Sequence, residues 1–417
     1  MTPLLFINLS EPQWEFEVLT ADQLLEELLR RARGLTQTET VLVELALGRV
    51  LAQPQVATIS VPPLDNSAMD GYAVRAAECV PGTLLAVSQR IAAGQVGGAL
   101  AAGSVARIFT GAPMPPGADA VVMQEYCSAD GGKVRINHQP KPGEHIRRAG
   151  EDIRPGDTIL PPGTRLGAAA MGLAASVGLA ALPVHRRLKV ASFSTGDELV
   201  QPGTTLGAGQ IYNSNRYTLA GLVQGLGCEW LDLGSVPDTL AATLDALQRA
   251  AAMADVVITS GGVSVGEEDH VKAAVEQLGK IDLWKVAMKP GKPLVYGRVG
   301  EADFIGLPGN PVSTFVTFVL FARPFLLRRM GVVEVLPKSY RVQAAFDWAK
   351  PGQRREFLRA RLQAGQGGEL EAQLFHNQSS GVLTSAVWAD GLVDIDIGHT
   401  VTHGELVRFI PFSEVLG

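Results

Sequence analysis

Cysteine and histidine are sparse in this sequence of 417 residues. The three cysteines, Cys79, Cys127 and Cys228, lie far apart without a CxxC motif, and the seven histidines show no spacing typical of a zinc site. A small, odd number of cysteines is usual in a reducing compartment, where disulfides rarely form. We therefore expect free thiols that pack as small apolar side chains.

Blocks of Lys or Arg are also absent, and the net charge is −6. Neither nucleic acid nor an anionic membrane is therefore expected as the main partner, and an anionic ligand would need a local pocket. The N-terminus has no basic region and does not resemble a signal peptide. An uncharged stretch, residues 166–184, is rich in Ala and Gly, which insert poorly into a bilayer. We predict that it forms a buried helix leading into a turn, in a cytoplasmic protein.

Hydrophobic residues make up 46% of the chain and charged residues 19%, as in soluble globular proteins. The length allows about two to four domains. Leucines at helical spacing predict a helix over residues 19–33, with Thr20 as its N-cap and Gly34 as its stop. A second helix is predicted over residues 38–52.

Three further regions have distinct patterns. From 70 to 145, short apolar runs between Gly and Pro predict a small β-rich domain. Over residues 187–333, strand-like and helical segments alternate, which predicts a mostly parallel sheet with helices on both faces. From 338 to 417 the pattern predicts the strands of a small barrel.

Polar loops follow the predicted strands of region 187–333. They read "STGDE", "VPDT", "SGGVSVGEED" and "GLPGNPVS". Ligands of such sheets bind at the carboxyl ends of the strands, so we expect these four loops to converge on one rim.

The loop "SGGVS" has the composition of an anion site. Gly261 and Gly262 can adopt conformations in which their amides point at a ligand, and Ser264 adds a hydroxyl donor. The alternative is a glycine-rich turn between a strand and a helix, without any ligand.

Carboxylates lie on three of the same loops. Mg²⁺ prefers carboxylates together with phosphate oxygens, and these loops supply the former. Helix capping is the alternative role for Asp238 and Asp269. The acidic residues of these loops are Asp197, Glu198, Asp238, Glu267, Glu268 and Asp269.

Two further segments offer groups for an oxyanion. "KVAMKPGKP" places Lys285, Lys289 and Lys292 around a turn, where ammonium groups can hold an anion or remain solvated on the surface. In "GLPGNPVS", Asn310 suits an N-cap and Pro311 the first helical position. Ser313 would then lie at the start of a helix.

Taken together, the motifs resemble those of the molybdopterin molybdenumtransferases, the MoeA-like enzymes related to the E domain of gephyrin. They occur in the family's order over residues 20–380, whereas the first fifteen residues lie outside the resemblance. The matching stretches are "DNSAMDGYAVR", "IFTGAPMPPGADAVVMQE", "IRRAGEDI", "FSTGDEL", "GQIYNSNR", "SGGVSVGEED", "WKVAMKPGKPL" and "GLPGNPVS".

The resemblance implies an α/β and β multidomain chain. Its expected parts are an elongated helical and extended domain, a β-rich insert, a three-layer molybdopterin-binding α/β domain and a C-terminal β-barrel. Their expected bounds are 16–60 with 145–186, then 61–144, 187–333 and 334–417. The implied reaction inserts molybdenum from molybdate into adenylylated molybdopterin, with Mg²⁺ as cofactor and AMP as product. The implied assembly is a homodimer with its active-site cleft between the subunits, in transient contact with other molybdenum cofactor enzymes.

The resemblance also assigns roles to single residues. Asp238 and Asp269 match positions for Mg²⁺, with Glu198 close by, and Gly261, Gly262 and Ser264 match the loop that binds the pterin substrate. Positions for molybdate correspond to Lys289, Lys292, Ser313, Arg359 of "EFLRA" and Ser380 of "HNQSS". Other functionally sensitive positions correspond to Asp70, Thr110, Asp152 and Lys285.

Two positions depart from the family pattern. Ala360 stands where the family usually has Gly, and "HNQSS" stands where it often has a His-Gln-Gly-Ser loop.

Two other functions remain as alternatives. A molybdopterin adenylyltransferase shares the "SGGVS" loop but needs only the α/β domain, and a non-catalytic scaffold would need an interaction groove.

Overall fold

The structure is a computed structural model that describes residues 17–262, 270–365 and 367–416. The chain forms two compact units. The large unit comprises Met1–Glu39, Gly48–Val50 and His185–Gly417, and the small unit comprises Thr40–Leu47 and Leu51–Val184.

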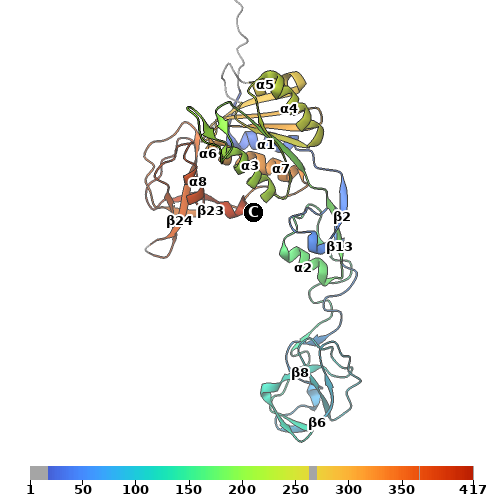
Figure 1. The fold of residues 1–417 in the computed structure, drawn as a ribbon. Helices are drawn as coiled ribbons and strands as arrows, with labels where there is room; N and C mark the ends of the chain where they lie inside the picture. Colours follow the sequence, from blue (N-terminus) through green and yellow to red (C-terminus); the bar gives the residue numbers. More distant parts are fainter. Residues whose placement is uncertain (1–16, 263–269, 366, 417) are drawn as a thin grey trace, which may run out of the picture. The chain divides into compact units, whose positions relative to one another are not determined.

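A seven-stranded mixed sheet forms the centre of the large unit (Figure 1). Its strands β22, β18, β14 and β17 are parallel, whereas β21 is antiparallel to both of its neighbours. In sheet order the strands are β1 (Glu17–Leu19), β19 (Gly279–Val286), β21 (Pro293–Val299), β22 (Ala302–Leu307), β18 (Val256–Ser260), β14 (Lys189–Thr195) and β17 (Glu229–Val236).

Helices cover both faces of this sheet, because its buried strands are apolar on both sides. On one face, Ala191 and Val257 pack in a core with α4 and α5. On the other face, Val190 and Ile258 pack with α1, α3 and the helices near residue 320. The helices are α1 (Ala21–Arg31), α3 (Ser214–Gly225), α4 (Leu240–Met253), α5 (His270–Leu278), α6 (Pro311–Thr317) and α7 (Arg323–Arg329).

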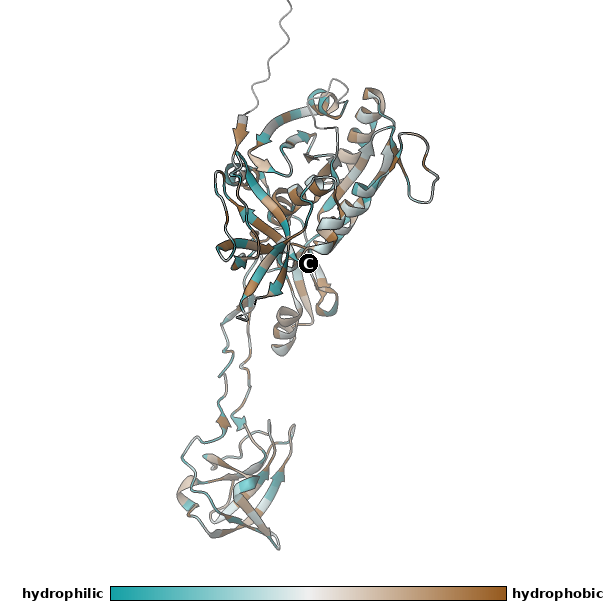
Figure 2. Ribbon diagram, turned by 90° about the vertical axis from the view of Figure 1, so that its left-hand side faces the viewer, coloured by the Kyte–Doolittle hydropathy of each residue, from teal (hydrophilic) through white to brown (hydrophobic). Residues whose placement is uncertain are grey.

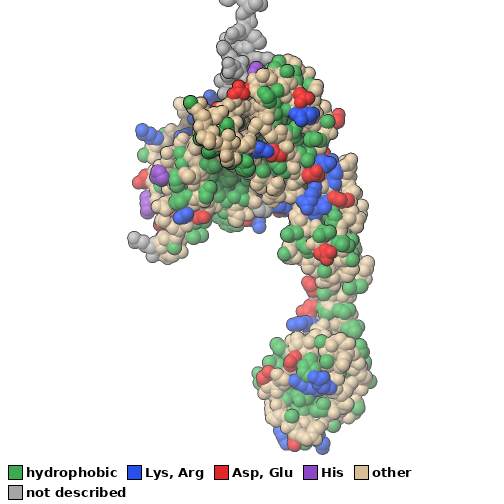
Figure 3. All heavy atoms as spheres, in the orientation of Figure 1, with side chains coloured by type: hydrophobic (Ala, Val, Ile, Leu, Met, Phe, Trp, Pro, Cys, Tyr) green, Lys and Arg blue, Asp and Glu red, His purple; other side chains and the backbone are tan. Residues whose placement is uncertain are grey.

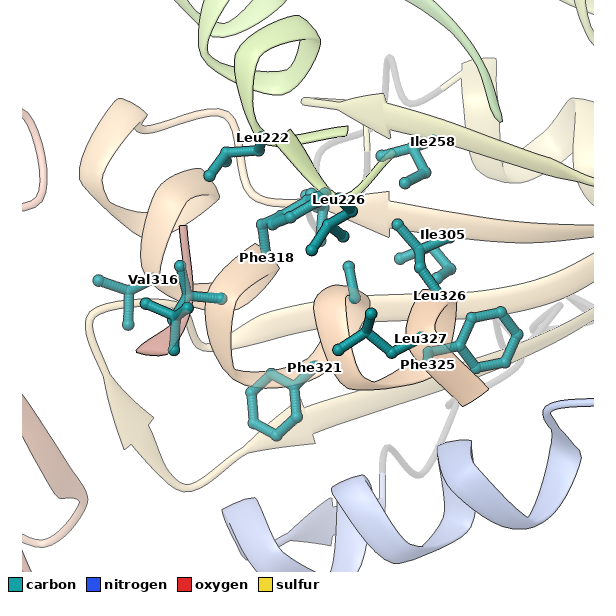
Figure 4. Packing of buried hydrophobic residues seen from close by; sticks show 14 of the residues in the cluster. Leu222, Leu226, Ile258, Ile305, Val316, Phe318, Phe321, Phe325, Leu326 and Leu327 are labelled. Carbon is teal, nitrogen blue, oxygen red and sulfur yellow. The ribbon is translucent and has the colours of Figure 1, made fainter. Parts of the chain in front are cut away.

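Helices α6 and α7 continue each other through a π-helical turn at Phe318–Ala322. Figure 4 shows Phe318, Phe321 and Phe325 of this segment packed beneath the sheet strands that carry Ile258 and Ile305. Within the described residues, Pro311–Arg329 is the one helix long and apolar enough to cross a membrane, and 83% of its apolar window is buried inside the protein. It therefore has the packing of a core helix.

The C-terminal part of the large unit is a closed barrel. Strands β24, β25, β23, β27 and β26 pair in a ring, closed by the pairing of β26 with β24, and β20 adds to β24. Exposed and buried residues alternate along β27 from Leu406 to Phe409, and Figure 2 shows hydrophilic and hydrophobic segments within the strands of the large unit. The elements are β20 (Met288–Lys289), β23 (Tyr340–Ala344), β24 (Arg355–Ala364), β25 (Leu370–Leu374), α8 (Thr384–Trp388), β26 (Gly391–Ile395) and β27 (Leu406–Pro411).

The small unit contains a six-stranded sheet and short strands that pair in three two-stranded ladders. The sheet order is β8 (Ala120–Met123), β5 (Gly71–Val74), β7 (Ser104–Ile108), β6 (Thr83–Ile91), β10 (Lys133–Ile136) and β9 (Cys127–Asp130). The remaining elements include β3 (Gln55–Val56), β4 (Asn66–Ser67), β11 (Ile146–Arg147), β12 (Thr158–Leu160) and α2 (Ala168–Ser176). Strand β2 (Thr38–Leu42), which begins in the large unit, pairs with β13 (Ala181–His185).

The expected fold class is confirmed, including the α/β domain, the β-rich insert and the barrel. The helix at 19–33 is also confirmed, since Thr20 caps α1 in a capping box with Gln23. The three cysteines are free thiols, and Cys79 and Cys228 are buried.

Two predicted helices differ in the structure. Residues 38–42 form strand β2 because β-branched Thr and Val favour an extended chain once a partner strand is available. Within 166–184, α2 and a turn at Gly178 do form, but Ala174 is the one buried residue of the helix. Ala170, Met171 and Leu173 pack partly buried against the core that contains Ala174, so one face of α2 contacts this core and the opposite face is exposed.

The surface carries both signs of charge. Figure 3 shows Lys and Arg side chains interspersed with Asp and Glu side chains on the visible face. Such a distribution agrees with the net charge of −6.

Candidate functional site

Two adjoining cavities lie in the large unit at the carboxyl ends of its parallel strands. The first has a volume of about 500 Å³ and the second about 720 Å³. Both are lined by Gly261 and Gly262 after β18 and by Gly309 and Asn310 after β22. These two loops therefore border both cavities, which adjoin at this point.

Glycine is required where the two loops meet. Gly261 and Gly262 have φ angles of +87° and +67°, which other residues rarely adopt. A Cβ on Gly262 would lie 2.5 Å from Cγ2 of Val271, which is too close, whereas one on Gly309 would lie 3.6 Å from the Cα of Gly261, an ordinary contact. The loops can therefore present backbone groups to a ligand at close range.

The first cavity carries two of the predicted carboxylates. Glu198 follows β14 and Asp238 follows β17, and both line this cavity. The expectation that Asp238 caps the next helix is wrong, because the Thr239 hydroxyl accepts the hydrogen bond from the Ala242 amide at the start of α4. The carboxylate of Asp238 is thus not used as a cap.

No metal-binding group of three or more His, Cys, Asp or Glu side chains occurs among the described residues. Ser264 and Asp269, which were predicted for substrate and Mg²⁺, lie outside the residues that the structure describes. The two carboxylates of Glu198 and Asp238 nevertheless fit Mg²⁺, which commonly takes one or two carboxylates together with phosphate oxygens and water.

The second cavity is basic and lies between the α/β domain and the barrel. It is lined by Lys289, Lys292, Ser313 and Ser380, so the structure brings together four of the five residues predicted for molybdate. Arg354, just before β24, adds a further cation that the sequence did not single out. Its position two residues before the "EFLRA" segment was the signal that the sequence offered.

The two lysines differ in their partners. Lys289 Nζ lies 3.4 Å from Oε2 of Glu356, whose side chain is buried. No ion pair joins Lys292 to a carboxylate within the described parts of the chain. Lys292 therefore has the less neutralised charge of the two.

Arg359 lies behind the second cavity and is not among its lining residues. Its side chain is fully buried, and its guanidinium donates to the Ser385 hydroxyl at 3.0 Å and to the Ser379 carbonyl at 3.2 Å. Burial lowers the pKa of Arg359 to about 10, so the group stays charged at neutral pH.

The backbone of Arg359 also holds the "HNQSS" loop. Its amide donates to Oε1 of Gln378 and its carbonyl accepts from Nε2 of the same side chain, each at 2.9 Å. The Ser380 carbonyl in turn accepts from the Val312 amide at the start of α6. Sequence reasoning missed Gln378, which joins the barrel strand to the loop that carries Ser380.

Lys285 lies in β19, opposite Pro293, and is not among the residues that line either cavity. The structure therefore does not place Lys285 at the wall of either cavity, although the sequence predicts a role for it at the site.

The small unit holds the remaining predicted residues. The amide and the hydroxyl of Thr110 both donate to Oδ1 of Asp70, each at 2.8 Å. The hydrogen bonds from the Thr110 amide and hydroxyl stabilise the ionised form of Asp70 and hold its pKa below its usual range. Asp152 is exposed, and its amide donates to the Val61 carbonyl. Asp70 and Thr110 are therefore in contact, whereas no hydrogen bond joins Asp152 to them within this fully described unit.

Comparison with known families identifies the class of protein that these domains define. The sequence matches the MoeA N-terminal region (domain I and II) over residues 19–178 and a probable molybdopterin binding domain over 191–328. It matches the MoeA C-terminal region (domain IV) over 341–412.

Individual relatives cover nearly the whole chain. A protein of Haemophilus influenzae named molybdopterin molybdenumtransferase is 39% identical over 404 residues, which cover 96% of this chain and 100% of that protein. Molybdopterin molybdenumtransferase 2 of Mycobacterium tuberculosis is 40% identical over 385 residues, covering 88% of this chain and 92% of that one. The chain belongs to the MoeA family of molybdopterin molybdenumtransferases.

Solved structures agree with this membership. A crystal structure of the molybdopterin biosynthesis MoeA protein from Pyrococcus horikoshii has a TM-score of 0.74 and 32% sequence identity. The match covers 95% of this chain and 99% of the other. A second structure from the same organism has a TM-score of 0.80 at 26% identity and covers 95% and 100% of the two chains.

Proposed function

We propose that the protein is a molybdopterin molybdenumtransferase that acts in molybdenum cofactor biosynthesis. Its substrates are molybdate and adenylylated molybdopterin, and its products are AMP and the molybdenum-loaded pterin. The observation that carries this proposal is the pair of adjoining cavities, one with carboxylates and one with lysines, joined at Gly261, Gly262 and Gly309.

The separation of charge suits two different ligand groups. The first cavity would take the adenylate linkage, where Glu198 and Asp238 would hold Mg²⁺ together with phosphate oxygens. Mg²⁺ would supply charge neutralisation at the phosphate. We extend the metal site to Asp269, and the substrate loop to Ser264, from their positions in the family motif.

The second cavity would take molybdate. Molybdate is a tetrahedral dianion, and Lys289, Lys292 and the Ser313 and Ser380 hydroxyls supply cations and donors around the cavity. Arg359 would act by positioning the loop that carries Ser380, because its side chain lies behind the cavity wall. Lys285 is proposed as a further contributor on its motif position.

The residues of the small unit are proposed to complete the site of a second subunit. In a homodimer, Asp70, Thr110 and Asp152 of one subunit would face the two cavities of the other. Large exposed hydrophobic side chains in residues 42–64, such as Leu45 and Leu47 at 64% and 63% exposure, support a subunit contact. We further propose the four-domain division given above, a cytoplasmic location, and transient contact with other molybdenum cofactor enzymes.

The test is to incubate the full-length protein with adenylylated molybdopterin, molybdate and Mg²⁺ and to measure molybdenum in the pterin product. A second reaction with molybdopterin and ATP tests for the adenylyltransferase. Adenylylated product from the second reaction, without molybdenum transfer in the first, would reject the proposed function. Omission of Mg²⁺ should abolish AMP release if the metal is required.

A further inference from the structure

A row of arginine and aromatic side chains crosses the six-stranded sheet of the small unit next to Asp70. On paired strands, Arg90 of β6 stands beside Arg107 of β7, and Arg107 stands beside Tyr72 of β5. Side chains at paired positions share a face of the sheet, and residues two apart on a strand share it too. Phe109, two residues after Arg107, therefore continues the same face.

Both guanidinium groups lie against one aromatic ring. The Cζ atoms of Arg90 and Arg107 lie 4.5 Å and 4.8 Å from the centre of the Phe109 ring. Arg107 also lies 5.2 Å from the Tyr72 ring and donates to the Gly71 carbonyl at 3.1 Å. The rings thus hold two cations in fixed positions beside the Asp70–Thr110 pair.

Neither arginine makes an ion pair within the small unit, all of whose residues are described, although Arg107 lies close enough to Asp70 to help lower the pKa of that carboxyl group. No ion pair joins Arg90 or Arg107 to a carboxylate there, and the side-chain partner of Arg107 is the neutral amide oxygen of Gln124, at 2.6 Å. Like charges at paired positions of neighbouring strands repel each other. Two adjacent arginines with one nearby carboxylate, Asp70, leave a net positive charge on this face that an anion would stabilise.

We propose that Arg90 and Arg107, stacked on Phe109 beside Asp70 and Thr110, form an oxyanion-binding surface of the small unit. The inference rests on the proposed function, because both proposed substrates carry oxyanions. One source is a phosphate group of the adenylylated pterin, and the other is molybdate. Guanidinium groups bind either ligand through charge-assisted hydrogen bonds, and the aromatic ring keeps them in place.

Binding to the full-length protein can be measured by calorimetry with three separate probes, namely AMP, pyrophosphate and molybdate. We expect Arg90→Gln and Arg107→Gln each to weaken oxyanion binding about tenfold, the loss of one charge-assisted hydrogen bond. Arg90→Lys should weaken it less because the charge remains. Arg135→Gln is the matched control, since Arg135 is an exposed arginine on β10 of the same sheet.

Thermal unfolding separates this role from a structural one. Arg90→Gln should leave the melting temperature unchanged or raise it, because the repulsion between paired arginines is relieved. Weaker AMP and pyrophosphate binding would assign the surface to phosphate, and weaker molybdate binding alone would assign it to molybdate. Wild-type affinity of both Gln variants for all three probes, or no binding by the wild-type protein, would overturn the inference. Absence of molybdenum transfer by the wild-type protein would reject the proposed function instead, and the binding comparison would still decide this inference.

Discussion

At the scale of single residues, the charge of each lysine in the second cavity depends on its neighbours. Lys289 lies beside the buried carboxylate of Glu356, whereas Lys292 has no ion pair with a described residue. We expect Lys292→Gln to raise the molybdate concentration for half-maximal activity by about tenfold, and Lys289→Gln to raise it less. Activity is measured over a molybdate series, with Lys280→Gln as a control because Lys280 is exposed at the start of β19. An unchanged molybdate dependence in both variants would remove the lysines from the molybdate site.

The ion pair between Arg186 and Asp255 contributes to the stability of the fold. Burial raises its pKa, but hydrogen bonds from Arg186 and from the Lys189 amide outweigh burial and lower the pKa below its ordinary value. A carboxyl group whose pKa is lowered by folding stabilises the fold at pH values above its unfolded pKa. This contribution is lost as the pH falls through the folded pKa. Asp255→Asn should therefore lose about 3 kcal/mol at neutral pH. The difference from wild type should shrink below about pH 5.

Denaturant unfolding at a series of pH values checks this prediction. Asp245→Asn serves as the control, because Asp245 pairs with Arg249 on an exposed part of α4. Equal losses for the Asp255 and Asp245 variants at neutral pH would contradict the assigned role of the Arg186–Asp255 pair.

At the scale of elements, two neighbouring residues at the start of α4 have different roles, one as helix cap and one at the cavity wall. Thr239 makes the capping hydrogen bond, and Asp238 lines the first cavity. We expect Thr239→Ala to lower the unfolding free energy by about 1 kcal/mol. Asp238→Asn should leave stability within about 0.5 kcal/mol but raise the Mg²⁺ concentration needed for AMP release. The reverse pattern, with loss of stability on changing Asp238, would restore Asp238 as the cap.

Sequence patterns predicted the elements of the large unit well, because strand and helix periods alternate there and glycine ends α3 at Gly227. They failed at β2, where pairing with β13 decides the conformation of a segment that also has helical spacing. They predicted Lys289 and Ser380 at one site through the family motif. The burial of Arg359 could not be predicted, since it depends on Ser379 and Ser385 of a neighbouring loop and helix.

At the scale of the whole molecule, the proposed dimer makes each site from two subunits. Asp70→Ala and Asp269→Asn homodimers should both be inactive, whereas a mixed dimer contains one doubly altered site and one intact site. Random exchange makes half of the dimers mixed, so activity should recover to about one quarter of wild type after the two variants are refolded together. Mass spectrometry confirms mixed dimers. Their formation without recovery of activity would place each site within one chain.

In the proposed function, one protein couples adenylate cleavage to molybdenum transfer across the two cavities. The most direct measurement follows AMP and pterin-bound molybdenum in the same reaction of the full-length protein. We expect one AMP for each molybdenum transferred, with both products lost in Asp238→Asn at limiting Mg²⁺ and restored by excess Mg²⁺. Release of AMP at the full rate without any molybdenum on the pterin, at saturating molybdate, would contradict this coupling.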